Sequence, residues 1–295
     1  MPLRIAGLAA VATVIGVAGC GASGAKHASL AALDGKTGAV MWTGKTDALF
    51  LTTPAVVGNV VTVWADFETA DGCPGDTRPV AFDRTTGRRV RSRATPLQPN
   101  LANTAVAHDL HIRAHERGLV IASNSTGRVV WRTRLPHGRF NIDPIPVFAG
   151  AGIVAAFPDS SGGLGMLYGD PKTSLIALDD RTGRVLWRLG PWGDAIVEPA
   201  FGPRTVYLFN DPHHLEALDP HTGHPRWHSR VDEGAITVSS RLVIAGPGRV
   251  SALSLGGRLL WSTKILKSTA PQPAADNGND LYVPIEGASG SSCSD

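Results

Sequence analysis

Apolar and polar residues alternate along the chain in short stretches that end at turn residues, which is typical of β-strands. In Leu175–Trp187 the alternation stops at Asp179 and resumes after Thr182 and Gly183. A period of two indicates a strand with two different faces. An aspartate carboxylate and a threonine hydroxyl can accept hydrogen bonds from the free N–H groups of a turn, and glycine can take the positive φ that closes it. The stretch therefore predicts a β-hairpin whose return strand ends at a tryptophan.

The same hairpin design recurs along the chain. Complete copies lie at residues 30–42 and 215–227, and three altered copies complete a set of six. These are residues 79–91 with Arg91 in the tryptophan position, 119–131 with Ser123 in the aspartate position, and 250–261, one residue short. The units follow one another at intervals of about 35 to 55 residues, a period typical of propeller blades.

Indoles at one repeat position predict wedges between successive units rather than separate binding sites. The repeat positions that we expect to be structural are Asp34, Gly38, Trp42, Asp179, Gly183, Trp187, Asp219, Gly223, Trp227, Trp131 and Trp261.

Between the hairpins lie second apolar stretches that also read as strand pairs. They occupy residues 54–65, 103–114, 144–157, 198–209, 236–245 and 273–285. Two pairs of strands make a four-stranded blade. The folded chain begins with an outer pair and ends with an inner pair, and joining the two completes a blade and removes two exposed sheet edges. We therefore expect an all-β fold, a six-bladed β-propeller over residues 30–295. The alternative is a shortened form of a propeller with seven or eight blades.

The repeat pattern A-x-D-x-x-T-G-x-x-x-W resembles the tryptophan-docking repeat of pyrroloquinoline-quinone-type (PQQ-like) β-propellers. It matches well at residues 30–42, 175–187 and 215–227 and partly in the other units. That family includes quinoprotein dehydrogenases and non-catalytic envelope lipoproteins that resemble BamB. The resemblance implies a propeller fold, but it says much less about chemistry because one architecture hosts many functions.

The N-terminal residues have the pattern of an export signal. Residues 1–19 carry one basic residue, Arg4, followed by an uncharged apolar run and small residues. The tetrapeptide that ends at Cys20 resembles a bacterial lipobox, in which the cysteine is acylated and becomes the first mature residue. We expect residues 20–29 to be a tether and Cys20 to anchor an exported protein to a membrane of the cell envelope. The alternative is an ordinary signal peptide that happens to contain a cysteine.

Composition supports one large domain and argues against nucleic-acid binding. The 295 residues are 43% hydrophobic, which is ample for one core, and the net charge is only +3. No run of basic residues interleaved with aromatic residues is present.

No catalytic motif or cofactor-binding motif stands out in the chain. A quinoprotein resembling this fold would carry an adjacent cysteine pair and a calcium site, whereas the cysteines here are Cys20, Cys73 and Cys293. Eight of the ten histidines form two groups, at 108–115 and 213–228. Residues an odd number apart in a strand face opposite ways, and others flank a turn, so we expect exposed histidines rather than a metal site. We therefore expect no cofactor, no metal and no enzymatic activity.

The predicted function is a lipid-anchored scaffold that docks an envelope protein or peptide on one face of the propeller. Two long loops, residues 67–78 and 159–173, are expected on the same face and are candidate binding segments. The alternatives are an extracytoplasmic sensor of a small ligand and a quinoprotein-type oxidoreductase. Closure of the ring would bring Cys73 and Cys293 into neighbouring loops, which predicts a disulfide in an exported protein.

Overall fold

The computed structural model is an all-β molecule. Its described part contains no α-helix, and therefore no helix long and apolar enough to cross a lipid bilayer. The residues described are 27–52, 54–68, 74–91, 104–115, 118–135, 146–158, 173–192, 198–246, 248–265, 274–276 and 279–285.

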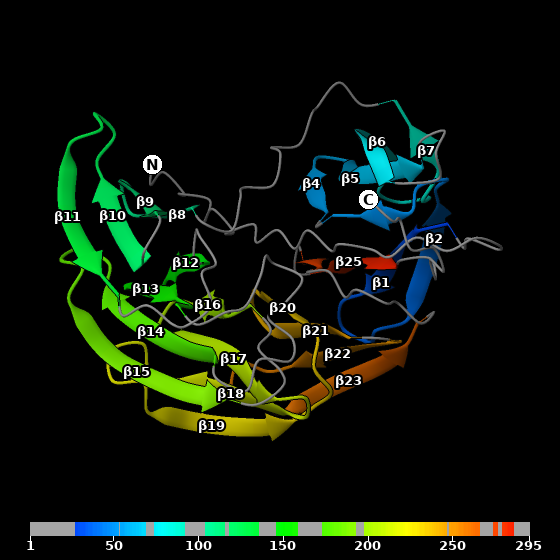
Figure 1. Cartoon of the computed structure of the whole chain (residues 1–295). Coiled ribbons are helices and arrows are strands. Elements are labelled where there is room, and N and C mark those ends of the chain that lie inside the picture. Colours follow the sequence, from blue (N-terminus) through cyan, green and yellow to red (C-terminus); the bar gives the residue numbers. More distant parts are fainter. Residues whose placement is uncertain are drawn as a thin grey trace, which may run out of the picture.

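Six antiparallel sheets lie around a common centre, and each sheet is one blade of a propeller (Figure 1). The predicted six-bladed propeller is confirmed. We number the blades in chain order, starting from the one that holds both ends of the described chain. Blade 1 contains β1 (Ser29–Asp34), β2 (Val40–Lys45), β24 (Ala275–Asp276) and β25 (Asp280–Ile285). Blade 2 contains β3 (Phe50–Leu51), β4 (Ala55–Val57), β5 (Val60–Glu68), β6 (Pro74–Asp83) and β7 (Arg89–Val90). Blade 3 contains β8 (Thr104–Ala107), β9 (Leu110–His115), β10 (Leu119–Ser123) and β11 (Val129–Arg134).

The other three blades follow the same plan, and their outermost strands are β15, β19 and β23 (Figure 1). Blade 4 contains β12 (Val147–Gly150), β13 (Ile153–Ala156), β14 (Thr173–Asp179) and β15 (Val185–Trp192). Blade 5 contains β16 (Ala200–Gly202), β17 (Thr205–Asp211), β18 (His214–Leu218) and β19 (Pro225–Arg230). Blade 6 contains β20 (Ala235–Val238), β21 (Leu242–Gly246), β22 (Arg249–Leu253) and β23 (Leu259–Lys264). In blade 2, β3 and β4 share one edge of β5, so this sheet also has four strand positions.

Blade 1 joins the two ends of the chain, as the sequence predicts. Strand β1 pairs antiparallel with β25, from Ser29 opposite Ile285 to Asp34 opposite Asp280. The ladder satisfies the backbone groups of two strands that would otherwise be exposed sheet edges.

Two ion pairs hold the neighbours of blade 1 in place. The Arg241 guanidinium of blade 6 bonds both carboxylate oxygens of Asp276, at 2.8 and 2.9 Å, and also donates to the Gly35 carbonyl. The Asp276 side chain is fully buried, so loss of its arginine partner would leave an uncompensated charge. On the other side, Arg84 of blade 2 donates to Asp280 at 2.7 Å.

In blades 1, 2, 4 and 5 the turn of the outer hairpin is built by the aspartate at the end of the inner strand of the pair. Asp179 Oδ1 accepts hydrogen bonds from the Thr182 hydroxyl at 2.7 Å and from the Thr182 N–H at 2.8 Å. These bonds, led by the one from the hydroxyl, lower the pKa of Asp179. Gly183 has a φ of 70° and donates its N–H to the Asp179 carbonyl. The predicted D-x-x-T-G turn is therefore present.

Five repeat tryptophans, in every blade except blade 2, each join their blade to the next. In each case the indole N–H donates to a carbonyl in the outer turn of the following blade: Trp42 to Arg84, Trp131 to Asp180, Trp187 to Pro220, Trp227 to Leu255 and Trp261 to Gly35, at 2.7 to 3.1 Å. The ring also covers the turn glycine, and a methyl group built on Gly183 would lie 2.5 Å from Trp131. Glycine is thus needed both for its backbone conformation and for the space that it leaves. We call each such contact a tryptophan staple.

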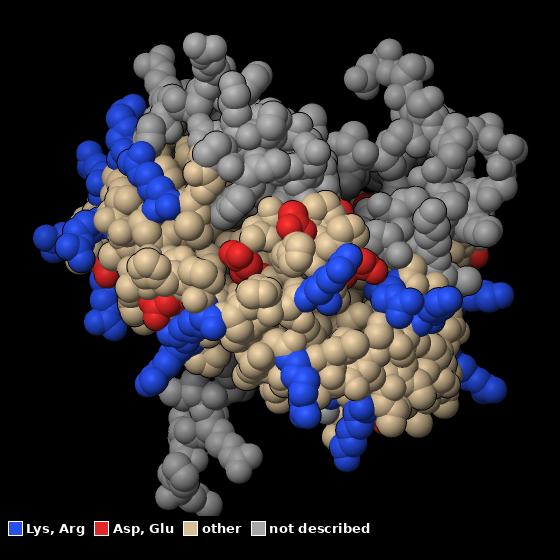
Figure 2. Space-filling view, turned by 90° about the horizontal axis from the view of Figure 1, so that it is seen from below, with Lys and Arg blue, Asp and Glu red and all other residues tan. Residues whose placement is uncertain are grey.

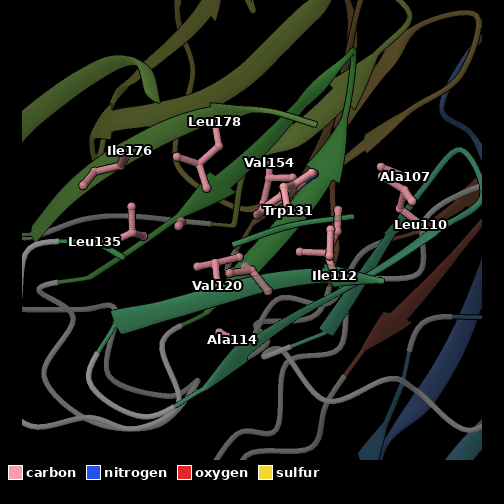
Figure 3. Close-up of a cluster of buried hydrophobic side chains, with 13 residues drawn as sticks. Ala107, Leu110, Ile112, Ala114, Val120, Trp131, Leu135, Val154, Ile176 and Leu178 are labelled. Carbon is pink, nitrogen blue, oxygen red and sulfur yellow. The ribbon is translucent and has the colours of Figure 1, made fainter. Parts of the chain in front are cut away.

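The core of the molecule is divided into clusters that lie between successive blades. Figure 3 shows the cluster between blades 3 and 4, in which Trp131, Ile112 and Val120 face Val154 and Leu178. Similar clusters join blades 4 and 5, 5 and 6, 6 and 1, and 1 and 2. Full burial of each large apolar side chain contributes about 1.5 to 3 kcal/mol. Among the described residues, no such cluster joins blade 2 to blade 3.

Candidate interaction surface at the seam between blades 2 and 3

The hairpin of blade 2 does not offer an indole to blade 3. Arg91 occupies the tryptophan position and is exposed. In the five units with a tryptophan, the strand register shifts by one residue just before the indole. Such a bulge adds local twist and re-aims a side chain. In blade 2 the short strand β7 pairs Val90 with Ala81 without a shift. Blades 2 and 3 consequently stand at the two ends of the arc in Figure 1 without a staple between them.

The outer turn of blade 3 differs from the sequence expectation by one position. Asn124, not Ser123, takes the role of the aspartate. Its Oδ1 accepts hydrogen bonds from the Thr126 hydroxyl at 2.7 Å and from the Arg128 N–H at 3.0 Å. Ser123 instead continues the strand and pairs with Val129. The assignment of Ser123 to the turn was wrong because residues 119–131 have the usual length, which hides a turn that is one residue shorter.

This shorter turn has a counterpart in blade 6 that does hold an indole. Gly127 donates its N–H to the Asn124 carbonyl at 2.9 Å, and Gly257 donates to the Ser254 carbonyl at the same distance. Their φ angles are 80° and 84°. A methyl group built on Gly257 would lie 2.7 Å from the Trp227 ring, whereas one on Gly127 would have no atom within 4 Å. The turn of residues 124–128, which we call the indole socket, thus has the backbone of a stapled turn and an uncovered glycine.

Blade 3 buries only one of its two faces. Along β9 the residues alternate strictly between buried and exposed, whereas every residue of β13 in blade 4 is buried. The buried side packs on blade 4. The other side, which we call the open face, is turned away from blade 4. Strand pairing places on it Val106, His111, Arg113, His115, Leu119, Ile121, Ser123, Arg132 and Arg134.

The open face combines positive charge with apolar surface. The exposed residues Arg113 and Arg132 flank Ile121 in one cross-strand row. Neither arginine forms a hydrogen bond or an ion pair within the described chain, and none of the nine open-face residues is acidic. Val106 is 55% exposed. Figure 2, which views the molecule from below, shows Lys and Arg side chains on the left, the lower and the right parts of that side. The open face is complementary to an acidic and partly apolar ligand.

Several sequence-predicted site residues lie outside the described residues. These are Cys20, Cys73 and Cys293, together with residues 69–73 and 159–172 of the two long loops. The lipid anchor, the disulfide and the loop sites therefore remain predictions. The repeat residues lie within the described ranges, the aspartates and glycines in outer turns and the tryptophans at contacts with the following blade.

Three of the described histidines pair with carboxylates. His108, His213 and His214 lie 2.5 to 3.3 Å from the carboxylates of Asp180, Asp232 and Asp211 respectively. Within the described ranges, no three His, Cys, Asp or Glu side chains gather as a metal site would require. The calcium and the cysteine pair that a quinoprotein resemblance implies thus have no matching residues there, and the chain has no adjacent cysteines.

Two half-buried glutamates with buried carboxylate oxygens lie outside the predicted site residues. Glu198 and Glu233 each stand two residues before the innermost strand of their blade, β16 and β20. Both Glu198 carboxylate oxygens and one Glu233 oxygen are buried without a hydrogen-bond partner among the described residues. Burial raises the pKa of Glu198 to about 7 and also raises that of Glu233. The sequence does contain a signal for these two glutamates, because each stands two residues before an alanine that begins an innermost strand, in Glu198–Ala200 and in Glu233–Ala235.

The comparisons with known proteins agree with the repeat pattern. The model of the family described as outer membrane protein assembly factor BamB matches residues 11–108, 80–243 and 171–289, which together span most of the chain. No curated protein matches the chain.

Among solved structures, BamB from Moraxella catarrhalis is 14% identical, with 96% of each chain covered and a TM-score of 0.35. The computationally designed protein Ika8 is 13% identical, with 94% of this chain and 97% of that chain covered and a TM-score of 0.41. Quinohemoprotein alcohol dehydrogenase from Comamonas testosteroni is 16% identical, with 88% of this chain and 48% of that chain covered and a TM-score of 0.40. The repeats, the six blades and the family match together show that the chain belongs to the BamB-like family of PQQ-like β-propellers.

Proposed function

We propose that the protein is an exported, lipid-anchored and non-catalytic scaffold of the bacterial cell envelope that docks a protein or peptide. The open face of blade 3 carries this proposal. It is an exposed sheet surface with basic and apolar side chains, on a blade whose opposite face is packed in the core. The propeller architecture alone would leave the function open, because propellers host many activities. An uncovered sheet face of this kind is a feature of interaction surfaces.

The family match supports the envelope part of the proposal, since the matching model is described by a protein of outer membrane assembly. Cys20 follows the small residues at 17–19, in the order of a lipobox. An acyl-anchored propeller would present its blades to partners close to the membrane. Acyl chains contribute about 0.8 kcal/mol per buried methylene, so two or three chains hold a protein on a bilayer.

Affinity capture from detergent-solubilised envelope tests the binding function. We expect the full chain to retain a specific protein, and a triple variant with Arg113→Glu, Arg132→Glu and Arg134→Glu to lose it. Exposed arginines at other blades, such as Arg188 and Arg230, provide the matched control when changed to glutamate. Equal capture by both triple and control variants would contradict docking on the open face. An absorbance band of a quinone in the purified protein would contradict the non-catalytic assignment.

The anchor has its own test. Cys20→Ser should release the protein from membranes or leave its precursor unprocessed, as judged by fractionation and by the mass of the mature chain. Normal maturation and membrane association of Cys20→Ser would contradict lipidation at this residue.

A further inference from the structure

We propose that the seam between blades 2 and 3 receives a tryptophan from a partner polypeptide, in a segment whose other residues are mainly acidic. This inference rests on the proposed binding function and specifies its ligand. It assigns the indole socket to the tryptophan and the open face to the acidic flanks.

The internal comparison with blade 6 indicates what the socket can hold. In blade 6, Trp227 covers Gly257 and its indole N–H donates to the Leu255 carbonyl at 3.1 Å. The equivalent carbonyl in blade 3 belongs to Ser125, because Asn124 corresponds to Ser254. The two turns share their hydrogen-bond pattern and their glycine φ. A flat aromatic ring with one N–H donor therefore fits the blade 3 turn as it fits the blade 6 turn.

The chain does not supply this ring from the preceding blade. Arg91 stands where the indole should be, and β7 lacks the bulge that aims it. Arg91 is exposed and offers no ring to the turn of blade 3. A ring that fills the socket must therefore come from a partner polypeptide. The positive charge of the open face selects a partner segment that is acidic.

The open face determines how the segment continues beyond the indole. Arg113 and Arg132 lie in one cross-strand row with Ile121, and His115 and Arg134 lie in the next row with Leu119. An extended peptide crossing these rows would place acidic side chains near the arginines and its backbone over the two apolar residues. Arginine is suited to such contacts because its guanidinium bonds carboxylates in a bidentate manner.

Fluorescence anisotropy with a synthetic probe tests the proposal on the full mature chain. The probe is a fluorescein-labelled ten-residue peptide with one central tryptophan and two acidic residues on each side. We expect it to bind at least tenfold more tightly than the same peptide with alanine for tryptophan, and at least tenfold more tightly than one with serine for the acidic residues. A phenylalanine peptide should bind with intermediate affinity, since it retains the ring but loses the N–H donor.

Two variants of the protein block the socket in different ways. Gly127→Asn adds a side chain on the uncovered turn, and asparagine tolerates positive φ better than most residues. Arg91→Trp supplies the chain with its own indole as an intramolecular competitor. Both should weaken probe binding at least tenfold. Arg188→Glu, at the repeat position in blade 4 that corresponds to Arg132, should leave binding unchanged, whereas Arg132→Glu should weaken it. Thermal unfolding of each variant shows whether the ring is intact.

Three results would overturn the inference. Equal binding of the tryptophan and alanine peptides would show that charge alone drives association. Unchanged affinity of correctly folded Gly127→Asn and Arg91→Trp would place the site elsewhere. Self-association of the chain in sedimentation experiments, lost in Gly127→Asn, would identify a second copy as the occupant. If envelope capture still depends on the arginines of the open face in any of these cases, the proposed function stands while this inference fails.

Discussion

At the scale of single residues, the carboxylates fall into two groups with opposite effects on stability. The turn aspartates accept hydrogen bonds in their charged form, which lowers their pKa values. For Asp219 the pKa falls to about 2, chiefly because Arg226 donates to its carboxylate at 2.7 Å. A lowered folded-state pKa stabilises the protein above the unfolded value of about 4 and loses this effect as the pH falls toward 2. We therefore expect these turns to lose part of their stabilising effect below pH 4.

Glu198 has the opposite dependence and gives the first prediction. Its pKa is raised from 4.5 to about 7 by burial, so the folded state holds the proton more tightly than the unfolded state. The neutral form is tolerated below pH 4.5, and stability falls as the pH rises from 4.5 through 7. Glu198→Gln should remove this loss. Because one pKa unit corresponds to about 1.4 kcal/mol, the variant should reduce the difference in unfolding free energy between pH 5 and pH 8 by about 1 to 3 kcal/mol. Urea titrations at pH 5 and at pH 8 measure this difference in unfolding free energy.

Asp109→Asn, at an exposed carboxylate in the β8–β9 turn, is the control and should leave that difference unchanged. An identical pH dependence in Glu198→Gln and the unaltered chain would show that Glu198 does not titrate as its burial indicates.

At the scale of elements, the hairpin with its tryptophan staple is the unit that repeats. Trp187 is only 8% exposed and donates its indole N–H to the Pro220 carbonyl at 2.7 Å. It also packs over Gly223, where an added methyl group would lie 2.8 Å from the ring. The staple therefore combines apolar burial, a hydrogen bond and a positive-φ glycine in one contact.

The second prediction concerns this staple. Trp187→Ala should lower the free energy of unfolding by about 3 to 5 kcal/mol, because it leaves a large cavity between blades 4 and 5. Trp187→Phe should cost less, since the ring remains while the hydrogen bond is lost. Trp192, which lies outside the repeat position at the end of β15, is the comparison, and Trp192→Ala should cost clearly less. Equal losses for both alanine variants in a denaturant titration would refute a special role for repeat tryptophans.

Much of this element could be predicted from the sequence. The turn aspartate, the positive-φ glycine and the tryptophan wedge follow from local hydrogen bonding and period-two alternation. The role of Asn124 could not be predicted. Residues 119–131 are as long as the complete copies, so their length does not reveal that the turn inside them is one residue shorter. The open face could not be predicted either. Arg91 is visible in the sequence, but its effect falls on Gly127, which lies 36 positions away in a different blade, and that link exists only in three dimensions.

At the scale of the whole molecule, the sequence predicts how the ring joins its ends. The order of outer pair first and inner pair last requires β1 to pair with β25, and the register from Ser29 to Asp34 bears this out. What the repeat pattern does not predict is the support beside this ladder. The buried pair of Arg241 and Asp276 comes from non-repeat positions, and its partners are separated in the sequence by β21, β22 and β23.

The third prediction is a disulfide between Cys73 and Cys293, both outside the described residues. In the closed topology, the loop after β25 and the loop between β5 and β6 hold equivalent places in blades 1 and 2. Export would expose both thiols to oxidising conditions. A bond enclosing this much chain could contribute about 4 to 5 kcal/mol at most. Peptide mapping without reductant should recover the linked pair from protein isolated from the envelope, and free thiols at both positions would contradict it.

The last prediction concerns how stability is distributed around the ring. Blades 4, 5, 6 and 1 are each packed on both sides by core clusters, whereas blade 3 packs only on blade 4 and blade 2 only on blade 1 within the described chain. Local opening should therefore need less free energy at the seam than on the opposite side of the ring. In native-state hydrogen exchange, we expect the amides of β9 and β10 to exchange at least tenfold faster than those of β17 and β18, which hold the same positions in blade 5.

Two variants test this expectation. Arg91→Trp should reduce the difference in exchange rate between blades 3 and 5 by supplying a sixth staple, and Trp227→Ala should create a second region of fast exchange between blades 5 and 6. Uniform protection of blades 3 and 5 in the unaltered protein would mean that the seam is as tightly packed as the stapled contacts, and the open face would then not be available to a partner.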